Sequence, residues 1–187
     1  MEKSRLFSIF LDRYLEYCSK FRKEREEKRI AVKELCFCSK RYYASGEEVL
    51  FKPQVIIGTL VDMGIKSLIY FPVIPEPKII EKEIEGYTIV GSPDIITENG
   101  IIEIKYSTKS NVNDWDVLQL RIYLWLCDMK YGELWYYTPM GIVVEEINNP
   151  CTDDEIIDLI KRRDEPKWKW ECITCQLDCE KRKEVIK

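Results

Sequence analysis

The sequence predicts a mixed α/β fold with additional segments at both ends of a central sheet. Its hydrophobic period changes from helical to alternating after the Pro-rich residues 71–78, and it returns to helical near residue 114. The last part of the chain is instead rich in cysteine and tryptophan. The 187 residues, of which 45% are hydrophobic and 33% charged, suffice for one domain with a buried core.

The first part of the chain is expected to form two helices. Residues 5–29 repeat apolar side chains at spacings of three and four, from Leu6 to Cys18, and continue into a stretch of mixed charge. Residues 54–70 predict the second helix, which begins after Pro53.

Alternating and β-branched runs predict strands after the Pro-rich stretch. They cover residues 78–85, 87–97, 101–106, 132–138 and 142–147. Residues 114–130 predict a helix with a buried face, which starts after an Asn/Asp cap. Residues 152–163 predict a further helix, because Thr152 and Glu155 have the spacing of a capping box.

The composition excludes several classes of chemistry. The chain has no histidine, so Ser-His, Cys-His and His-metal mechanisms are excluded. Its net charge of −4 means that binding a polyanion needs a local basic patch or a bound metal. No signal peptide or membrane-spanning run is visible, so we expect a cytoplasmic location and no membrane partner. Eight cysteines in such a chain indicate metal binding rather than a disulfide framework.

The most informative stretch is the hairpin expected between residues 90 and 107. If Asn99 and Gly100 form a two-residue turn, Asp94 lies opposite Lys105, and Glu103 falls on the same face as both. Two carboxylates and an ammonium then converge on one side of an Ile-rich strand pair. The alternative is a solvated face with a cross-strand ion pair between Asp94 and Lys105.

This set of side chains suits phosphodiester hydrolysis. Carboxylate oxygens are the ligands that Mg²⁺ and Mn²⁺ prefer, so Asp94 and Glu103 would hold the ion. The ion would polarise the phosphate and lower the pKa of a bound water. Lys105 would orient or deprotonate that water, or stabilise the transition state.

Four short motifs then carry a family resemblance. Pro93-Asp94 followed by Glu103-Ile104-Lys105 resembles the PD-(D/E)xK signature of restriction-endonuclease-like nucleases. Gln119 and Tyr123 match the Q-x-x-x-Y motif of the RecB-like branch. Residues 38–43, CSKRYY, are similar to the C-P-R-K-Y-Y motif of that branch, and the C-terminal spacing is C-x2-C-x3-C, from residue 172 to residue 179. Together, over roughly residues 35–182, they resemble the CRISPR-associated iron–sulfur exonucleases (Cas four).

The resemblance implies one RecB-like nuclease domain over residues 1–187. It consists of an N-terminal helical segment (1–52) with the first cluster cysteine, a nuclease core (53–150) and a C-terminal helix with a Cys-rich tail (151–187). The core would be a mixed central sheet flanked by helices, and the tail would be an iron–sulfur cap.

The resemblance also implies roles for single residues. The family carries a histidine in G-x-x-x-H, where this chain has Gly58 and Asp62. Asp62 would then join Asp94, Glu103 and the backbone carbonyl of Ile104 as a ligand of Mg²⁺ or Mn²⁺, or else face solvent on an amphipathic helix. The implied catalytic residues are Asp94, Glu103, Lys105, Gln119 and Tyr123.

The C-terminal cysteines predict a metal centre. Three thiols within eight residues cannot all pair with one another, and with one distant cysteine they would bind an iron–sulfur cluster or zinc. The resemblance favours a 4Fe–4S cluster, with 2Fe–2S as an alternative and zinc less favoured. Its ligands would be Cys38, Cys172, Cys175 and Cys179, with Cys36 as the rival of Cys38.

Basic and aromatic residues around the cysteines predict a path for single-stranded DNA or a shield for the cluster. They are Lys40, Arg41, Arg162, Lys167, Trp168, Lys169 and Trp170. The implied function is a metal-dependent exonuclease on single-stranded or end-frayed DNA that processes prespacers beside the Cas one–Cas two integrase, with self-association left open. The alternatives are a catalytically weak subunit that binds DNA ends, and an iron–sulfur redox module.

Overall fold

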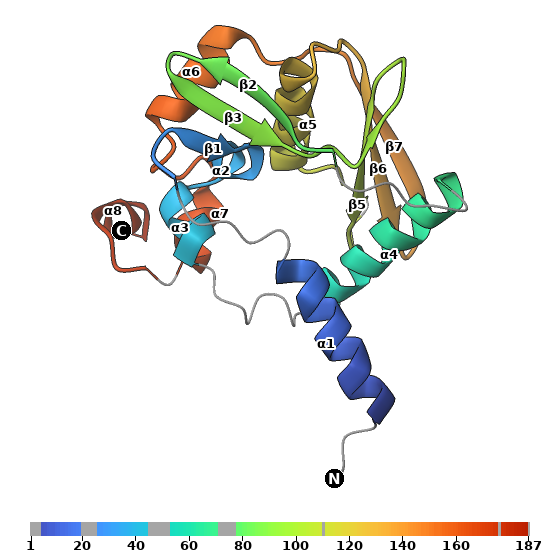
Figure 1. Ribbon diagram of the computed structural model, residues 1–187. Coiled ribbons are helices and arrows are strands. Elements are labelled where there is room, and N and C mark those ends of the chain that lie inside the picture. The colour runs from blue at the N-terminus through green and yellow to red at the C-terminus, as the bar shows by residue number, and fades with distance from the viewer. Residues whose placement is uncertain are drawn as a thin grey trace.

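The computed structural model describes residues 5–19, 26–44, 53–70, 78–109, 111–175 and 177–186. Figure 1 shows the arrangement of its helices and strands. In chain order they are α1 (Arg5–Ser19), β1 (Arg29–Ala31), α2 (Val32–Cys36), α3 (Ser39–Ala44), α4 (Pro53–Ile69), β2 (Ile80–Ile84), β3 (Tyr87–Gly91), β4 (Ile95–Ile96), β5 (Ile101–Tyr106), α5 (Asp114–Leu126), β6 (Gly132–Thr138), β7 (Gly141–Ile147), α6 (Asp153–Lys161), α7 (Lys169–Thr174) and α8 (Glu180–Ile186).

The predicted mixed α/β architecture is confirmed, but the described strands form two sheets instead of one central sheet. One has the order β1-β3-β2, and the other has the order β4-β5-β6-β7. Both are mixed, because β1 runs parallel to β3 and β5 runs parallel to β6, whereas the other pairs are antiparallel. Helix α5 forms the crossover between the parallel strands β5 and β6, as a parallel pair requires.

The prediction for residues 5–29 is wrong at its C-terminal end. Helix α1 ends at Ser19, and Arg29 already begins strand β1, which pairs with β3. Arg29 also donates hydrogen bonds to both carboxylate oxygens of Glu81 on β2. The mixed-charge stretch of residues 20–25 lies outside the described part of the chain. A strand of three residues is too short to show an alternating period.

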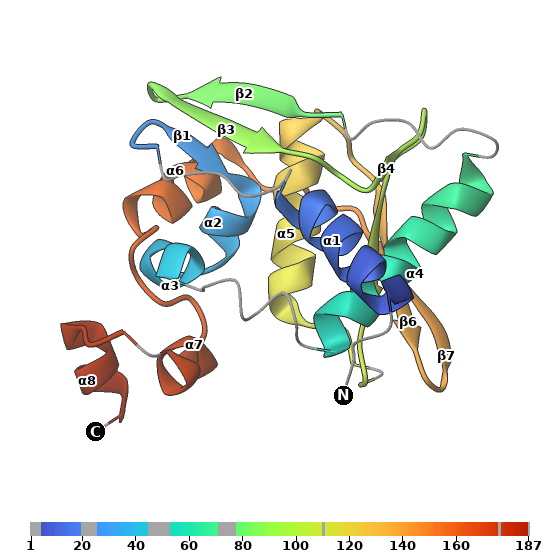
Figure 2. The same cartoon turned by 60° about the horizontal axis from the view of Figure 1, so that its bottom comes forward.

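Helix α5 is the centre of the hydrophobic core. Figures 1 and 2 show it between the two sheets, and it contacts strands of both. Leu120, Ile122 and Leu124 are fully buried on it. Gly91 on β3 permits this packing, because a Cβ at that position would lie 2.6 Å from a ring carbon of Tyr123. The helix ends earlier than the predicted residue 130, and a residue just beyond it, Asp128, has a φ of 55°.

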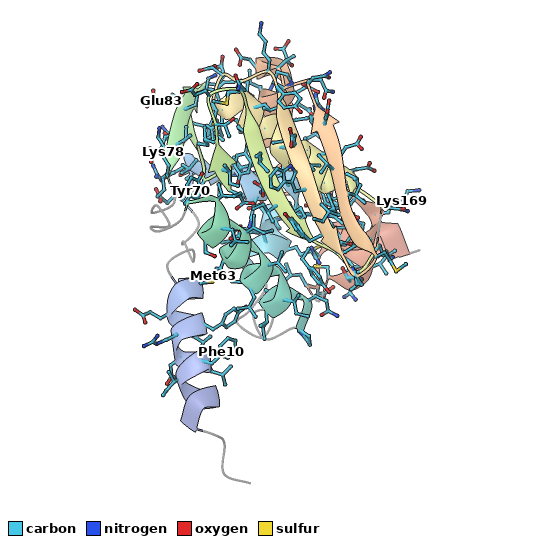
Figure 3. All side chains as sticks on the ribbon, turned by 90° about the vertical axis from the view of Figure 1, so that its right-hand side faces the viewer. Phe10, Met63, Tyr70, Lys78, Glu83 and Lys169 are labelled. Carbon is cyan, nitrogen blue, oxygen red and sulfur yellow. The ribbon has the colours of Figure 1, made fainter. Side chains whose placement is uncertain are left out.

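The remaining helices cover the edges of this core. Helix α4 lies across the four-stranded sheet and contacts β5, and Met63 lies on its side that faces α1 (Figure 3). The capping box of α6 is confirmed, since Thr152 and Glu155 exchange side-chain and backbone hydrogen bonds of 2.8 and 3.2 Å. Helices α7 and α8 lie beside α3 at one end of the molecule (Figure 1). Among the helices described, none has the length and apolar character needed to cross a membrane.

Candidate functional site

The hairpin that predicted the site has a different register from the one expected. Ile95 pairs with Ile102 instead of Ile104, which places Asp94 opposite Glu103 instead of Lys105. Thr97 and Gly100 flank the turn: the Thr97 N–H donates to the Gly100 carbonyl at 2.9 Å, and the Thr97 hydroxyl accepts hydrogen bonds from the N–H groups of Asn99 and Gly100. The error is two residues, so the predicted faces are retained.

Asp94 precedes the short strand β4 and reaches the neighbouring strand with its side chain. Its Oδ2 accepts a hydrogen bond of 2.8 Å from the backbone N–H of Ile104 on β5. This bond fixes the carboxylate beside the strand that carries Glu103 and Lys105. The role predicted for the Ile104 carbonyl stays a prediction.

Glu103, Lys105 and Gln119 form one buried hydrogen-bonded group. The Lys105 Nζ donates to Glu103 Oε1 at 2.6 Å and to Gln119 Oε1 at 2.9 Å. The Gln119 Nε2 donates to the same Glu103 Oε1 at 2.9 Å. Glu103 and Gln119 are only 3% and 4% exposed, so these bonds lie away from solvent. Helix α5 thus holds the lysine and the glutamate of β5 in one geometry.

Tyr123 lies one turn after Gln119 and completes this side of the site. Its hydroxyl accepts a hydrogen bond of 3.2 Å from Gln119 Nε2. Burial raises the pKa of Tyr123 well above its usual value, and the charge of Glu103 raises it further. Tyr123 is therefore a neutral phenol at physiological pH, able to orient Gln119 but not to act as a base.

Asp116 on α5 is a site residue that the sequence analysis missed. It is buried, and its Oδ1 lies 3.7 Å from Lys105 Nζ. The hydroxyl of Tyr136 donates a hydrogen bond to the other oxygen of Asp116. Its place in the first turn of a helix gave no signal, since acidic residues there are common.

Helix α4 brings Asp62 to the site, together with a lysine that the sequence analysis did not single out. The Lys66 Nζ lies 2.9 Å from Asp62 Oδ1 and 2.8 Å from Asp94 Oδ1. Asp62 thus shares an ammonium with Asp94 and does not simply face solvent. Its spacing of four residues from Lys66 on one helix was the available signal.

The charge of Asp94 contributes to raised pKa values at two neighbouring carboxylates. Burial raises the pKa of Glu103 to about 7, and the charge of Asp94 adds to that effect. Burial also raises the pKa of Asp62, again with a contribution from Asp94. Burial alone would lower the pKa of Lys105, but the charges of Glu103, Asp116 and Asp94 raise it above its usual range. Without a bound ion, Lys105 is therefore an ammonium group.

The donor set fits a hard divalent cation in its chemistry. Glu103 Oε2 is buried and makes no hydrogen bond to any described residue, so it is an acceptor without a donor. As the side chains stand, no three Asp, Glu or Cys residues within the described ranges are placed to hold a metal ion. At the carboxylates, the ammonium of Lys66 lies between two of the predicted ligands, Asp62 and Asp94.

The four cysteines predicted as cluster ligands line one cavity. Cys38, Cys172, Cys175 and Cys179 border a space of about 480 Å³ between α3 and the C-terminal helices. All four carry free thiols. Burial raises the pKa of Cys172, and the other three thiols add to that effect, which reflects their proximity. The rival Cys36 is fully buried and does not border the cavity.

Glu171 ties the two ends of the chain together at this cavity. It is 1% exposed and accepts hydrogen bonds from the backbone N–H groups of Cys38, Lys167 and Trp168, at 2.7, 2.8 and 3.0 Å. The sequence analysis missed it, because a glutamate beside a cysteine has no distinctive pattern.

Several residues predicted to bind DNA have other contacts. The Lys167 ammonium donates to the backbone carbonyl of Phe37 at 3.1 Å, and burial lowers the pKa of Lys167. Arg162 pairs with carboxylates of Asp158 and Glu165, both at 3.3 Å. Of the predicted set, Lys40, Arg162 and Lys169 are exposed, and Lys169 extends outward from α7 (Figure 3).

The two tryptophans of the tail pack inward. The Trp168 and Trp170 rings contact Trp115 with centroid distances of 6.2 and 5.0 Å, and the Arg41 guanidinium lies 4.8 Å from the Trp170 ring centroid. The Trp168 Nε1 donates to the carbonyl of Cys36 at 2.9 Å. This packing disfavours a surface for stacking bases, and neither tryptophan borders the cysteine cavity.

Comparison with known proteins shows a shared fold. No protein-family model and no curated protein matches the chain. The crystal structure of SSO0001 superposes with a TM-score of 0.81 and 27% identity, over 97% of this chain and 99% of that chain. The two proteins therefore share their fold from end to end.

Two exonuclease structures are more loosely similar. An alkaline exonuclease from Laribacter hongkongensis has a TM-score of 0.48 and 15% identity, over 73% of this chain and 84% of its own. A phage-related exonuclease from Haemophilus somnus has a TM-score of 0.41 and 19% identity, over 71% of this chain and 75% of its own. Likeness at this level carries no argument about the fold or activity of this chain.

Proposed function

We propose that this protein is a metal-dependent exonuclease that hydrolyses phosphodiester bonds at the ends of single-stranded DNA. One observation carries the proposal: Glu103 lies between Asp94 and the Lys105 ammonium with its Oε2 buried and without a donor among the described residues. A buried acceptor beside a second carboxylate is what a divalent cation would satisfy.

Each side chain then has a separate task. Asp62, Asp94, Glu103 and the carbonyl of Ile104 would hold Mg²⁺ or Mn²⁺. When bound, such an ion polarises the scissile phosphate and makes a water molecule nucleophilic at neutral pH. The Lys105 ammonium stabilises the negative charge that develops on the phosphoryl oxygens. Gln119 holds that ammonium, and Tyr123 and Asp116 hold Gln119 and Lys105 from either side.

The cysteine cavity would hold a 4Fe–4S cluster. Four cysteines around one space support this, and 2Fe–2S and zinc are the alternatives. Cys38 is the fourth ligand in this proposal because Cys36 does not border the cavity. The cluster would join the N-terminal segment to the tail, so its binding energy would add to the stability of the fold.

The biological role rests on the family resemblance. It would be the processing of prespacers during CRISPR spacer acquisition, beside the Cas one–Cas two integrase. Lys33 would add to the path of the DNA strand, since it is exposed and its charge is close enough to Asp62 and Glu103 to oppose part of the rise in their pKa values. Lys40 and Lys169 would extend the path toward the cysteine cavity.

Cleavage of end-labelled single-stranded DNA with Mn²⁺ or Mg²⁺ tests the proposal, with protein purified without air. Lys105→Ala and Glu103→Gln should each abolish cleavage. The matched controls Lys130→Ala and Glu98→Gln change exposed residues and should cleave like the wild type. Equal cleavage by all five proteins would place the activity elsewhere or in a contaminant.

The same assay separates the alternatives. Metal-independent DNA binding without cleavage would favour the subunit that binds DNA ends. Reversible reduction of the cluster without either activity would favour the redox module. Against that module stands the buried group of Glu103, Lys105 and Gln119, which electron transfer does not need.

A further inference from the structure

The ammonium of Lys66 lies where a cation would bridge two of the carboxylates. Its Nζ donates to Asp62 Oδ2 at 3.0 Å and to Asp94 Oδ1 at 2.8 Å. It also lies 2.9 Å from Asp62 Oδ1. Side chains of all three residues are about one fifth exposed, so solvent screens these contacts only in part.

This contact leaves Asp94 without an unused oxygen. Oδ1 faces Lys66, and Oδ2 accepts the hydrogen bond from the backbone N–H of Ile104. Glu103 differs, because its Oε2 has no donor among the described residues. The predicted metal ligands therefore differ: Glu103 pairs with the Lys105 ammonium through Oε1 but keeps Oε2 without a donor among the described residues, whereas the Lys66 ammonium lies against both aspartates.

An ammonium and a divalent ion cannot both stay at this place without strong repulsion. Mg²⁺ binds carboxylate oxygens at about 2.0–2.1 Å. An ammonium that stayed against the same oxygens would therefore lie within roughly 4 Å of the ion. Like charges at that distance repel strongly outside bulk water. Binding of the ion therefore requires the Lys66 side chain to move away.

We infer that Lys66 is a built-in competitor of the catalytic metal, which occupies Asp62 and Asp94 until the ion displaces it. This inference rests on the proposed function and adds a residue that sets the metal affinity of the same site. It also accounts for Asp62: the aspartate adds a negative charge, and the lysine one helical turn later neutralises that charge when no metal is bound.

Mn²⁺ binding to the metal-depleted full chain, with the cluster intact, tests the inference without measuring activity. The free Mn²⁺ signal in electron paramagnetic resonance gives the dissociation constant. Lys66→Met should bind Mn²⁺ at least tenfold more tightly than the wild type, a difference of about 1.4 kcal/mol. Lys66→Arg keeps the positive charge and should stay within threefold of the wild type, as should the control Lys130→Met.

Glu103→Gln, introduced into the wild type and into each Lys66 variant, identifies the Mn²⁺ binding that belongs to this site. If Mn²⁺ binding depends on Glu103 but Lys66→Met binds equally or more weakly, the inference is wrong and the proposed metal site stands. If no protein shows binding that depends on Glu103, the proposed function and the inference both fail.

Acylation of the wild-type protein gives a second test if Lys66→Met does not fold. A lysine in a tight ion pair reacts slowly with an N-hydroxysuccinimide ester. Mass spectrometry of the peptide containing Lys66 should show at least threefold faster labelling with saturating Mg²⁺ than without it. Lys130 is the internal control and should be labelled at a constant rate. Unchanged or slower labelling of Lys66 would show that Mg²⁺ does not displace its side chain from the aspartates.

Discussion

The carboxylate of Glu171 accepts a hydrogen bond of 2.7 Å from the backbone N–H of Cys38, which lies 133 residues earlier in the chain. The same carboxylate accepts two more backbone N–H groups from the start of α7. One buried side chain therefore sets where Cys38 stands relative to Cys172. Hydrogen bonds to a charged group typically stabilise a fold by about 1.5–3 kcal/mol each.

We predict that Glu171→Gln destabilises the protein and reduces cluster binding. The amide keeps one oxygen as acceptor but presents an N–H₂ group to a backbone N–H, so unfolding free energy should fall by about 2–4 kcal/mol. Urea unfolding and iron content per chain, both under anaerobic conditions, measure the two effects. The control Glu98→Gln changes an exposed residue away from the cavity and should leave both unchanged. If Glu171→Gln is less stable but binds as much iron as the wild type, Glu171 contributes to stability and not to cluster binding.

The choice between Cys36 and Cys38 gives the second prediction. Cys38→Ser should lower the iron content and the visible absorption of the anaerobic protein, because its thiol borders the cavity of the other three cysteines. Cys36→Ala should keep the iron and lower only the stability, by about 1–2 kcal/mol, because a small buried side chain is truncated. Loss of iron in Cys36→Ala with retention in Cys38→Ser would reverse the assignment.

The pKa of Glu103 gives a prediction about pH. Burial and Asp94 raise this pKa from 4.5 to about 7 in the folded, metal-free protein. Between these pH values the folded state binds more protons than the unfolded state, so stability falls as the pH rises through this window. The loss from this one group is on the order of 3 kcal/mol.

Glu103→Gln should remove that loss. Urea unfolding at pH 5, 6, 7 and 8 in EDTA should show a steeper decline of stability with pH in the wild type than in Glu103→Gln. Glu98→Gln, at an exposed position, should decline like the wild type. Parallel declines in the wild type and Glu103→Gln would mean that Glu103 ionises normally in the fold.

The sequence was sufficient to predict which side chains share the hairpin face, but not which residues lie opposite each other. Side chains alternate with a period of two, so the register error of two residues left Asp94, Glu103 and Lys105 on one side. The turn was misread because Asn99-Gly100 is typical of two-residue turns. Here Thr97 bonds to Gly100 through its backbone and its side chain, so the turn lies one residue earlier than expected. Gly100 fits because a Cβ there would lie 2.5 Å from the Tyr131 carbonyl oxygen.

Residues that act through tertiary contacts were beyond sequence reasoning. Lys66 and Asp62 form an ordinary pair on a helix, and only the fold adds Asp94, 28 residues later, to the same ammonium. Strand β1 was missed for the same reason, since its three residues are defined by pairing with β3. The cysteines were the reverse case: the spacing of three of them, with the family resemblance around Cys38, predicted a group whose four members border one cavity.

Gln119 provides the last prediction, because it contacts both charged partners of β5. Its Oε1 accepts from Lys105 and its Nε2 donates to Glu103, each at 2.9 Å. Gln119→Leu removes both bonds at similar volume and leaves Lys105 held only by Glu103 and Asp116. Loss of a residue that orients a catalytic group typically costs about 10–100-fold in activity or metal affinity.

We therefore expect the rate of single-stranded DNA cleavage by Gln119→Leu to fall about 10–100-fold at saturating substrate, with little change in the affinity for DNA. Single-turnover rates and filter binding measure the two quantities. Gln119→Glu is the informative companion: it keeps an acceptor for Lys105 but places a second buried charge beside Glu103, which should raise the pKa of Glu103 and shift the pH–rate profile upward. Wild-type rates in Gln119→Leu would show that Lys105 is held by Glu103 and Asp116 alone.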